Sequence, residues 1–417
     1  MFERDNWQEI FATIKKNKLR TTLTMFGVFW GILMLVIMLG SGNGLRHGIL
    51  RQFEGSATNS FYLWTQVTTK AYKGMKPGRH FNYNNTDTKI LERDPDFMVV
   101  SAQNQLGDYN GQNNVVHGLK TGAFAVLGQY PNLARIENIA ISKGRYINEL
   151  DIREKRKVCV VSSRVLEALF TPDENPIGQY IRINGVFFKI IGTTTPVGSG
   201  QAYRESANKI RIPFTTFQQA FNYGDIVGWF AVLARPDLPG EKVEQKAIDM
   251  MKERHKISPE DMQAVGHWNM ATEYDKITGL FNGIELLVWF VGIGTLMAGV
   301  IGVSNIMLIV VKERTREIGV KRALGATPFK VISQIILEAL FLTSMAGLAG
   351  LGLGVSAIHL LNEAIPVTDD SMFVNPTVNI TVVVYALMVL VLSGALAGFI
   401  PARKAVAINP VEALRAE

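Results

Sequence analysis

Cysteine is almost absent from this sequence, and that scarcity restricts its chemistry. The 417 residues include one cysteine, Cys159, so the chain can form neither an internal disulfide nor a metal site built from several cysteines. Valines surround Cys159, which predicts a buried thiol in a strand rather than a reactive one. The redox state of the compartment stays open.

Motifs that hold nucleotides, metals or catalytic nucleophiles are also missing. The sequence has no Gly-x-x-x-x-Gly-Lys-Ser/Thr phosphate loop, no His-Glu-x-x-His pair and no Gly-x-Ser-x-Gly elbow. The glycine-rich stretch 40–44 lacks the lysine and the preceding strand of a phosphate loop, and is interpreted as the flexible outer end of an apolar segment. We therefore predict no catalytic residue, no cofactor and no metal on this chain.

Charge is scarce, and apolar residues are abundant. Asp, Glu, Lys and Arg make up 19% of the residues and hydrophobic residues 47%, which favours a membrane protein over a soluble domain. The net charge of +7 comes from Lys and Arg that lie beside apolar segments, and no basic module with interleaved aromatics is seen. The positive charge therefore indicates membrane orientation, and no nucleic-acid partner is predicted.

Four apolar segments are long enough to cross a hydrocarbon core of about 30 Å. A cleavable signal peptide would have a shorter apolar core and a small-residue cleavage site, so the first segment is predicted to be a retained span. The four predicted spans are Thr21–Leu39, Leu286–Val311, about 331–361, and Ile380–Ile400.

Between the first two spans the sequence has the features of a globular domain. Asn184-Gly185 is a strong signal for a two-residue hairpin turn, and 70–87 is predicted to be a long loop or mobile arm. Division of this region into two lobes stays open. Predicted strands are 61–67, 158–162, 180–183, 186–191 and 229–234, and predicted helices are 163–170 and 241–256.

The predicted fold is a membrane α-helical protein with four transmembrane helices and a large mixed α/β extracytoplasmic domain inserted between helices 1 and 2. Residues 1–43 form an N-terminal amphipathic helix and the first transmembrane helix. Residues 44–279 form the extracytoplasmic domain. Residues 280–417 hold helices 2–4 and a charged segment, 312–330, which is either a docking element or only a solvated loop between two spans.

Lys and Arg set the predicted orientation. Residues 1–20 carry five of them and 312–330 carry six, whereas the loop 362–379 carries none. Both termini and 312–330 are therefore expected on the cytoplasmic side of the cell (inner) membrane, in contact with membrane lipid, with the large domain outside.

The segment 312–330 is predicted to form a helix, a sharp turn and a new helix. Gly325 can adopt the positive φ that ends a helix, and Thr327-Pro328 supplies an N-cap and a first-turn proline. Glu317 precedes Lys321 by four residues, the favourable order for a helical ion pair.

Glycines and two ionisable residues mark the last two spans. Gly350 and Gly354, like Gly394 and Gly398, lie four residues apart, so they suit close helix packing within one chain or between two. Glu338 and His359 are predicted to lie near the two interfaces, where snorkelling or headgroup contact is favoured over an ion pathway.

Two sequence stretches resemble a known family. The run Glu313–Ala326, and the tail 400–415 with Asn409-Pro410, resemble the FtsX-like and MacB-like permeases of ABC transporters. Within the large domain, Gly144-Arg145-Tyr146 and Pro176-Ile177-Gly178-Gln179 are similar to the MacB-type periplasmic core. Nearly the whole chain is covered by the resemblance.

The resemblance implies a permease subunit that passes ATP-driven motion to its extracytoplasmic domain. Its expected partners are a cytoplasmic ABC ATPase, which would be a separate polypeptide carrying ATP and Mg, and a second permease copy or a homologous permease. A periplasmic adaptor and an outer-membrane channel are further candidates. The expected ATPase-coupling residues are Glu313, Arg314, Arg316, Glu317, Ile318, Lys321, Arg322, Leu324 and Gly325.

Two functions fit this resemblance. One is efflux, or the movement of a peptide, lipid or lipoprotein, by mechanical work outside the membrane. The alternative is ATPase-linked signalling that regulates a cell-wall hydrolase or senses an external ligand. An ion-coupled secondary transporter is disfavoured by four spans without an evident inverted repeat. The sequence does not identify the substrate.

Overall fold

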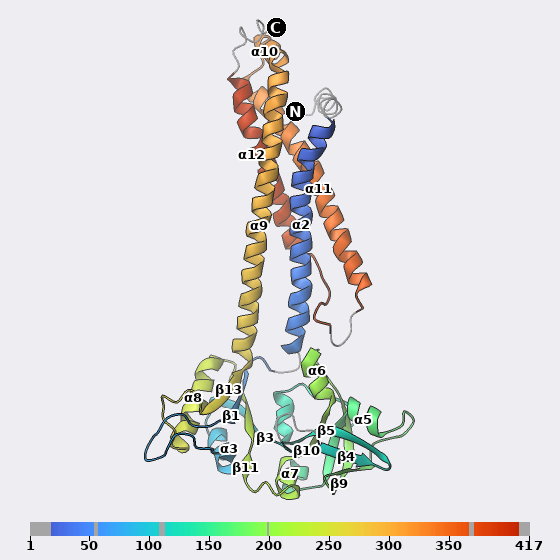
Figure 1. Cartoon of the computed structure of the whole chain (residues 1–417), viewed down its shortest axis with the longest axis vertical. Helices are drawn as coiled ribbons and strands as arrows, with labels where there is room; N and C mark the ends of the chain where they lie inside the picture. The colour runs from blue at the N-terminus through green and yellow to red at the C-terminus, as the bar shows by residue number, and fades with distance from the viewer. Residues whose placement is uncertain (1–17, 54–56, 108–112, 198–199, 367–370, 408–417) are drawn as a thin grey trace. The chain divides into compact units, whose positions relative to one another are not determined.

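The computed structural model describes residues 18–53, 57–107, 113–197, 200–366 and 371–407 (Figure 1). Within these residues, four helices are long and apolar enough to cross a membrane, which confirms the four predicted spans. The predicted amphipathic helix at 1–20 lies almost entirely outside the described residues, as does the end of the tail. The four helices are α2 (Lys18–Leu50), α9 (Met270–Glu313), α11 (Pro328–Ala364) and α12 (Ile380–Val406).

The chain divides into two compact units. The first, called here the helical bundle, comprises Met1–His47, Leu280–Val367 and Phe373–Glu417. The second, called here the large domain, comprises Gly48–Gly279 with Thr368–Met372.

Glycines let the bundle helices approach one another closely. A methyl group added to Gly398 would lie 2.9 Å from Ile336 Cα of α11, and one added to Gly350 would lie 2.5 Å from the Phe29 carbonyl oxygen of α2. Contacts this short leave no room for a side chain, so the small residues allow backbone-to-backbone packing. The predicted glycine spacing therefore serves packing within this chain.

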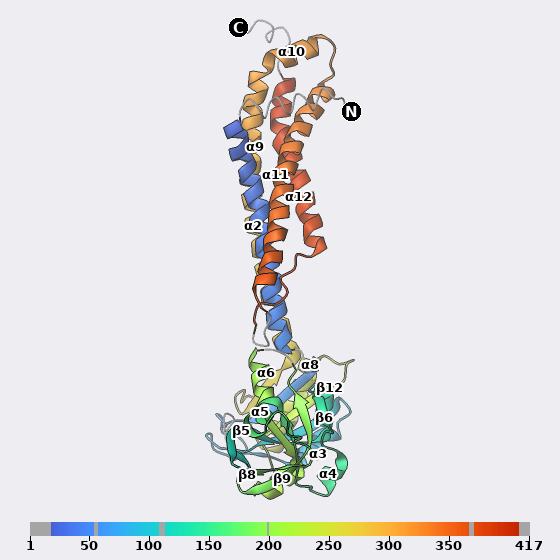
Figure 2. The ribbon, with the colours of Figure 1, turned by 90° about the vertical axis from the view of Figure 1, so that its right-hand side faces the viewer.

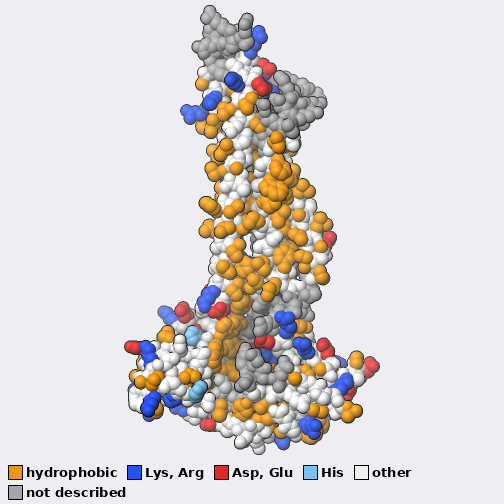
Figure 3. Space-filling view, viewed as in Figure 1, with side chains coloured by type: hydrophobic (Ala, Val, Ile, Leu, Met, Phe, Trp, Pro, Cys, Tyr) orange, Lys and Arg blue, Asp and Glu red, His pale blue; other side chains and the backbone are white. Residues whose placement is uncertain are grey.

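The surface of the bundle has two regions. Apolar side chains cover most of the visible face along the long helices, and Lys and Arg gather at one end (Figure 3). That end holds the short helix α10 (Thr315–Ala323), which lies where α2 begins and α12 ends (Figures 1 and 2). An apolar surface along the helices with Lys and Arg at one end is the distribution expected of a membrane-spanning bundle.

The large domain is a mixed α/β structure whose described strands fall in two sheets, one of eleven strands and one that pairs β2 with β11. In the large sheet, β10-β7-β9-β8-β4-β5 closes on itself because β10 also pairs with β5 in parallel, and β3-β12-β1-β13 continues from β5. The strands are β1 (Ser60–Thr65), β2 (Tyr83–Asn84), β3 (Phe97–Gln105), β4 (Asn113–His117), β5 (Lys120–Gln129), β6 (Ala140–Gly144), β7 (Val158–Ser162), β8 (Tyr180–Ile183), β9 (Val186–Thr195), β10 (Lys209–Pro213), β11 (Ile226–Val227), β12 (Trp229–Ala234) and β13 (Val265–Asn269).

Two apolar cores support these parts of the sheet. One is lined by residues of the closed ring, such as Phe188 and Ile212, and the other joins β1, β3 and β12 to the helices that cover them. Phe214 and Phe217 of α7 contribute to different cores, so this helix links the two. The helices are α3 (Asn85–Glu92), α4 (Glu149–Arg153), α5 (Ser163–Leu169), α6 (Gly200–Ala207), α7 (Phe214–Ala220) and α8 (Gly240–Arg254), with 3-10 turns η1 (Arg51–Phe53) and η2 (Pro131–Arg135).

Several local predictions for the large domain are confirmed. Asn184 and Gly185 have φ of 42° and 89° and join β8 to β9 as a two-residue hairpin. Cys159 is fully buried in the core of the closed ring, where burial raises the pKa of its thiol. The long loop predicted at 70–87 is confirmed for 70–82, which holds turns and one isolated bridge between Tyr72 and Met75, whereas 83–87 form β2 and the start of α3.

The close approach of α11 and α12 gives a testable expectation. Replacing Gly398 with Leu forces the Ile336 backbone away and should cost about 3 kcal/mol, which lowers the thermal midpoint of the purified chain in detergent. Gly352→Leu on α11 is the matched control, because a methyl at Gly352 meets no atom within 4 Å in the described residues. Equal midpoints for the two variants would contradict this packing.

Candidate coupling site

The segment singled out from the sequence forms a short helix between two spans. Arg314 alone separates α9, which ends at Glu313, from α10, which begins at Thr315. Arg314 has φ −99° and ψ 14°, and the Arg314 N–H still donates to the Val310 carbonyl at 3.0 Å. The junction is thus hydrogen-bonded on both sides, since the Ile318 N–H donates to the Arg314 carbonyl at 3.0 Å.

The turn after α10 has the geometry predicted for it. Gly325 has φ +96°, its N–H donates to the Arg322 carbonyl at 3.1 Å, and the Ala326 N–H donates to the Lys321 carbonyl at 3.0 Å. These two bonds form a Schellman motif, which satisfies carbonyls at the helix end. Thr327 occupies the N-cap position of α11 and Pro328 its first turn, although the Thr327 side chain makes no capping bond.

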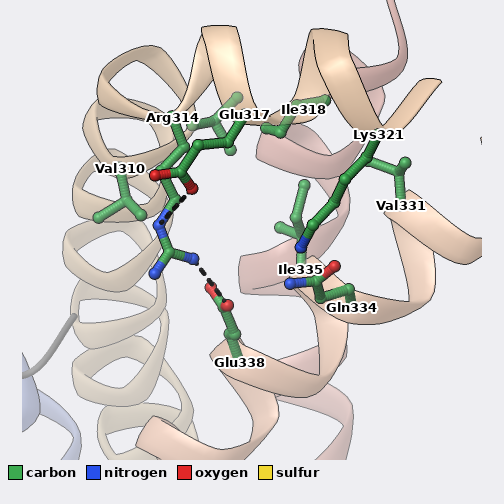
Figure 4. Close-up of a pocket in the computed structure, with 10 residues that line it drawn as sticks. Val310, Arg314, Glu317, Ile318, Lys321, Val331, Gln334, Ile335 and Glu338 are labelled. Carbon is green, nitrogen blue, oxygen red and sulfur yellow. Dashed lines mark hydrogen bonds and ion pairs between the residues drawn. The ribbon is translucent and has the colours of Figure 1, made fainter. Parts of the chain in front are cut away.

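Arg314 and Glu338 connect the start of α10 to α11. Arg314 Nη1 lies 3.0 Å from Glu338 Oε1, and the side chains are 21% and 7% exposed (Figure 4). The second contact of Arg314 is weaker, because Nε lies 4.0 Å from Glu317 Oε2 and the Glu317 side chain is exposed. Breaking a pair this well buried leaves an uncompensated charge, so the bond resists separation.

The same side of α10 makes two further contacts with the bundle. Ile318 is half-buried and packs against the apolar core that α2, α9, α11 and α12 share. Arg322 Nη1 donates to the Val406 carbonyl at 2.6 Å, at the C-terminal end of α12. A cation is favourable there because it faces the negative end of the helix dipole. Arg314, Ile318 and Arg322 are spaced by four, so they form one inward face.

The opposite side of α10 is exposed. Leu324 is 83% exposed and Val320 39%. Their spacing places them on one stripe, flanked by charges of both signs. We call this stripe and the charged residues beside it the outward face: Glu313, Arg316, Val320 and Leu324. Glu317 and Lys321 are also exposed, but they lie between the two faces and line a cavity beneath α10.

A small cavity lies beneath α10. It has a volume of about 30 Å³ and is lined by the Arg314–Glu338 pair, by apolar side chains of α9 and α11, and by Lys321 and Gln334 (Figure 4). This is room for about one water molecule. Among the described residues, no group of three or more His, Cys, Asp or Glu side chains could hold a metal ion.

The structure brings all nine predicted coupling residues together on or beside α10, but divides them between two faces. We expected Arg314, Ile318 and Arg322 to contact a partner directly, whereas all three face the bundle. The sequence reasoning missed Val406 as the acceptor for Arg322. It named Glu338 but not its partner Arg314, although an acidic residue inside a long apolar segment is a signal for a buried partner.

The prediction that Glu338 snorkels to the interface is wrong. Its side chain is 7% exposed and points toward Arg314 rather than outward. His359 differs, since its Nδ1 lies 3.5 Å from Glu363 Oε1 and both side chains are largely exposed. Headgroup contact by His359 stays a prediction.

The buried pair can be tested by charge exchange. Arg314→Glu or Glu338→Arg places like charges together and should cost about 2 kcal/mol, which lowers the thermal midpoint of the purified chain by several degrees. The double exchange restores opposite charges and should recover most of the loss. Lys312→Glu makes the same charge change on an exposed neighbour and should leave the midpoint unchanged. Additive losses in the double variant would contradict the pairing.

Comparison with family models gives two matches. The MacB-like periplasmic core domain matches residues 21–249, and the FtsX-like permease C-terminal region matches residues 289–410. The first covers more than half of the chain, and the second includes α10 and the turn at Gly325.

Curated relatives match over almost the whole chain. The pyoverdine export ATP-binding/permease protein PvdT of Pseudomonas fluorescens is 28% identical over 407 residues, which cover 96% of this chain and 58% of PvdT. The macrolide export ATP-binding/permease protein MacB of Psychrobacter cryohalolentis is 28% identical over 413 residues, which cover 98% of this chain and 59% of MacB. The chain thus spans about three fifths of the length of these relatives.

The periplasmic region of MacB from Actinobacillus actinomycetemcomitans aligns with 54% of this chain and 94% of its own, at 18% identity and a TM-score of 0.43.

Proposed function

The chain belongs to the family of ABC transporter permeases that combine a MacB-like periplasmic core domain with an FtsX-like permease region, and we propose that α10 is where an ABC ATPase drives it. In this proposal ATP-driven motion enters at the outward face of α10 and leaves through α11 and α12. The large domain then performs mechanical work on its substrate outside the membrane.

The observation that carries the proposal is the two-sided character of α10. Its outward face offers exposed Val320 and Leu324 among charged side chains, the pattern of a helix whose apolar anchors enter a groove on a partner. Glu313 and Arg316 would steer the encounter and fix its register, with Glu317 and Lys321 at the margin of the contact.

The inward face supports the transmission of force. Arg314 holds the start of α10 to α11, Ile318 packs in the shared core, and Arg322 holds the end of α10 to α12. The Schellman turn at Gly325 then joins α10 directly to α11 without a long linker. A displacement of α10 therefore moves two spans together, with little loss to bending.

Orientation follows from charge. We propose that α10 and both termini lie in the cytoplasm of a bacterial cell, because Lys and Arg concentrate in 1–20 and 312–330. We also propose, as the sequence led us to expect, that the ATPase is a separate polypeptide. The relatives' names join ATP-binding to permease in one protein, and this chain spans about three fifths of their length.

Export is the favoured activity. PvdT and MacB are named for export of pyoverdine and of macrolides, which supports efflux over a purely signalling role. Movement of a peptide, lipid or lipoprotein fits the same machinery, and regulation of a cell-wall hydrolase stays the alternative. A second permease copy or a homologous permease completes the proposed assembly. A periplasmic adaptor and an outer-membrane channel are its proposed further partners.

Substitutions on the two faces of α10 should differ in effect. Leu324→Asp changes an 83% exposed side chain, so it should reduce ATP hydrolysis stimulated by the permease about tenfold without lowering the thermal midpoint. Ile318→Asp buries a charge in the shared core, so it should lower both quantities. Both are measured on the full chain reconstituted with its ATPase.

Leu119→Asp is the matched control. It replaces a fully exposed leucine in the turn between β4 and β5 and should change neither quantity. Unchanged ATP hydrolysis in Leu324→Asp would show that the outward face does not carry the docking contact.

A further inference from the structure

The segment that follows β1 forms a projecting hairpin in the large domain. The Tyr72 N–H donates to the Met75 carbonyl at 3.1 Å, and the Met75 N–H donates back to the Tyr72 carbonyl at 2.9 Å. Lys73 and Gly74 between them have φ of 45° and 79°, the signs of a type I′ turn. We call residues 70–79 the basic hairpin. In Figure 1 it belongs to the dark blue loop at the margin of the large domain.

The base of the basic hairpin is fixed to the domain. Asp261 is fully buried, and its carboxylate accepts bonds from the Thr69 N–H at 2.7 Å, the Thr69 hydroxyl at 2.8 Å and the Lys70 N–H at 3.1 Å. Burial alone would raise the pKa of Asp261, but these hydrogen bonds outweigh it and hold the pKa below its ordinary value. On the other strand of the hairpin, the Arg79 side chain donates to the His255 carbonyl and so fixes that strand to the domain as well. The hairpin thus presents its side chains in a defined arrangement.

The charge of the basic hairpin has one sign. Residues 68–80 carry four cations and no carboxylate: Lys70, Lys73, Lys76 and Arg79. Lys70 lies 3.0 Å from exposed Glu260, but within the described part of the chain Lys73 and Lys76 are exposed and make no salt bridge. Lys256, also exposed, lies beside Arg79. Such a cluster raises the local concentration of an anionic partner.

A groove opens beside the base of the basic hairpin. It has a volume of about 520 Å³, and its polar lining is made mostly of carboxamides and hydroxyls that both donate and accept hydrogen bonds. His80 is the one ionisable side chain among its lining residues. The other polar lining residues are Gln66, Asn82, Gln263, Thr65 and Thr69.

We propose that the basic hairpin and this groove together bind an extended, carboxylate-rich segment of a partner protein. The lysines attract the acidic side chains, and the carboxamides and hydroxyls pair with the N–H and C=O groups of the extended backbone. A flat anionic lipid surface would contact the hairpin but leave the groove unused, so the groove favours a polypeptide. The proposal concerns the large domain and does not depend on where the ATPase docks.

The test uses the full chain in nanodiscs of neutral phosphatidylcholine. The probe is a fluorescein-labelled peptide in which glutamate alternates with serine, and the control probe has glutamine in place of each glutamate. Lys73→Glu with Lys76→Glu should raise the Kd of the acidic peptide about tenfold or more. Asn82→Trp, which fills the groove, should raise the Kd by a similar factor. Added salt should weaken binding to the unaltered chain.

The matched control is Lys143→Glu with Lys157→Glu, which reverses two exposed lysines elsewhere in the large domain and should change the Kd less than about twofold. The proposal is overturned if the glutamine peptide binds as tightly, or if the acidic peptide shows no saturable binding. It is also overturned if Asn82→Trp has no effect while phosphatidylglycerol vesicles bind through Lys73 and Lys76. That last outcome would assign the hairpin to lipid headgroups.

Discussion

Opposite charges placed at the end of an apolar bundle are held together by the cost of separating them. Arg314 and Glu338 are mostly removed from water, so each depends on the other for compensation. Because Arg314 lies at the junction of α9 and α10 and Glu338 lies three turns into α11, their bond fixes the position of the short helix against a span. The packing of Ile318, the bond from Arg322 to α12 and the turn at Gly325 all depend on that position. The exposed outward face of α10 is a consequence of the same arrangement.

Close helix packing makes the rest of the bundle suited to moving as a unit. Gly350 and Gly398 bring α11 against α2 and α12 at distances that exclude even a methyl group. Helices in such contact cannot slide independently without separating their backbones, so motion applied to α11 is shared by its neighbours. The large domain is built differently, since a closed ring of strands and an adjoining open sheet each surround a core, and α7 contributes to both. Its two cores make it a firm platform for surfaces such as the basic hairpin.

Much of the fold could be predicted because its signals are local. The four spans follow from length and apolar composition, the β8–β9 hairpin from Asn184-Gly185, and the end of α10 from Gly325. The faces of α10 could not be predicted, because charged residues lie on both and the spacing alone does not say which face meets the bundle. The partner of Arg314 lies 24 positions away in α11, and that of Arg322 lies 84 positions away in α12. Only the packing of the spans brings these groups together. Likewise, the hairpin at 70–79 depends on Asp261, far along the chain, which the local composition of that loop does not reveal.

In the proposed function, force reaches the spans through the bond between α10 and α11. The most direct measurement compares ATP hydrolysis stimulated by the full chain in proteoliposomes for Arg314→Glu, Glu338→Arg and the variant that exchanges both. We predict that each single change abolishes most of the stimulation and that the exchange restores it, because the exchanged pair again places opposite charges together. Full stimulation in both single variants, or none in an exchanged variant whose thermal midpoint has recovered, would contradict it.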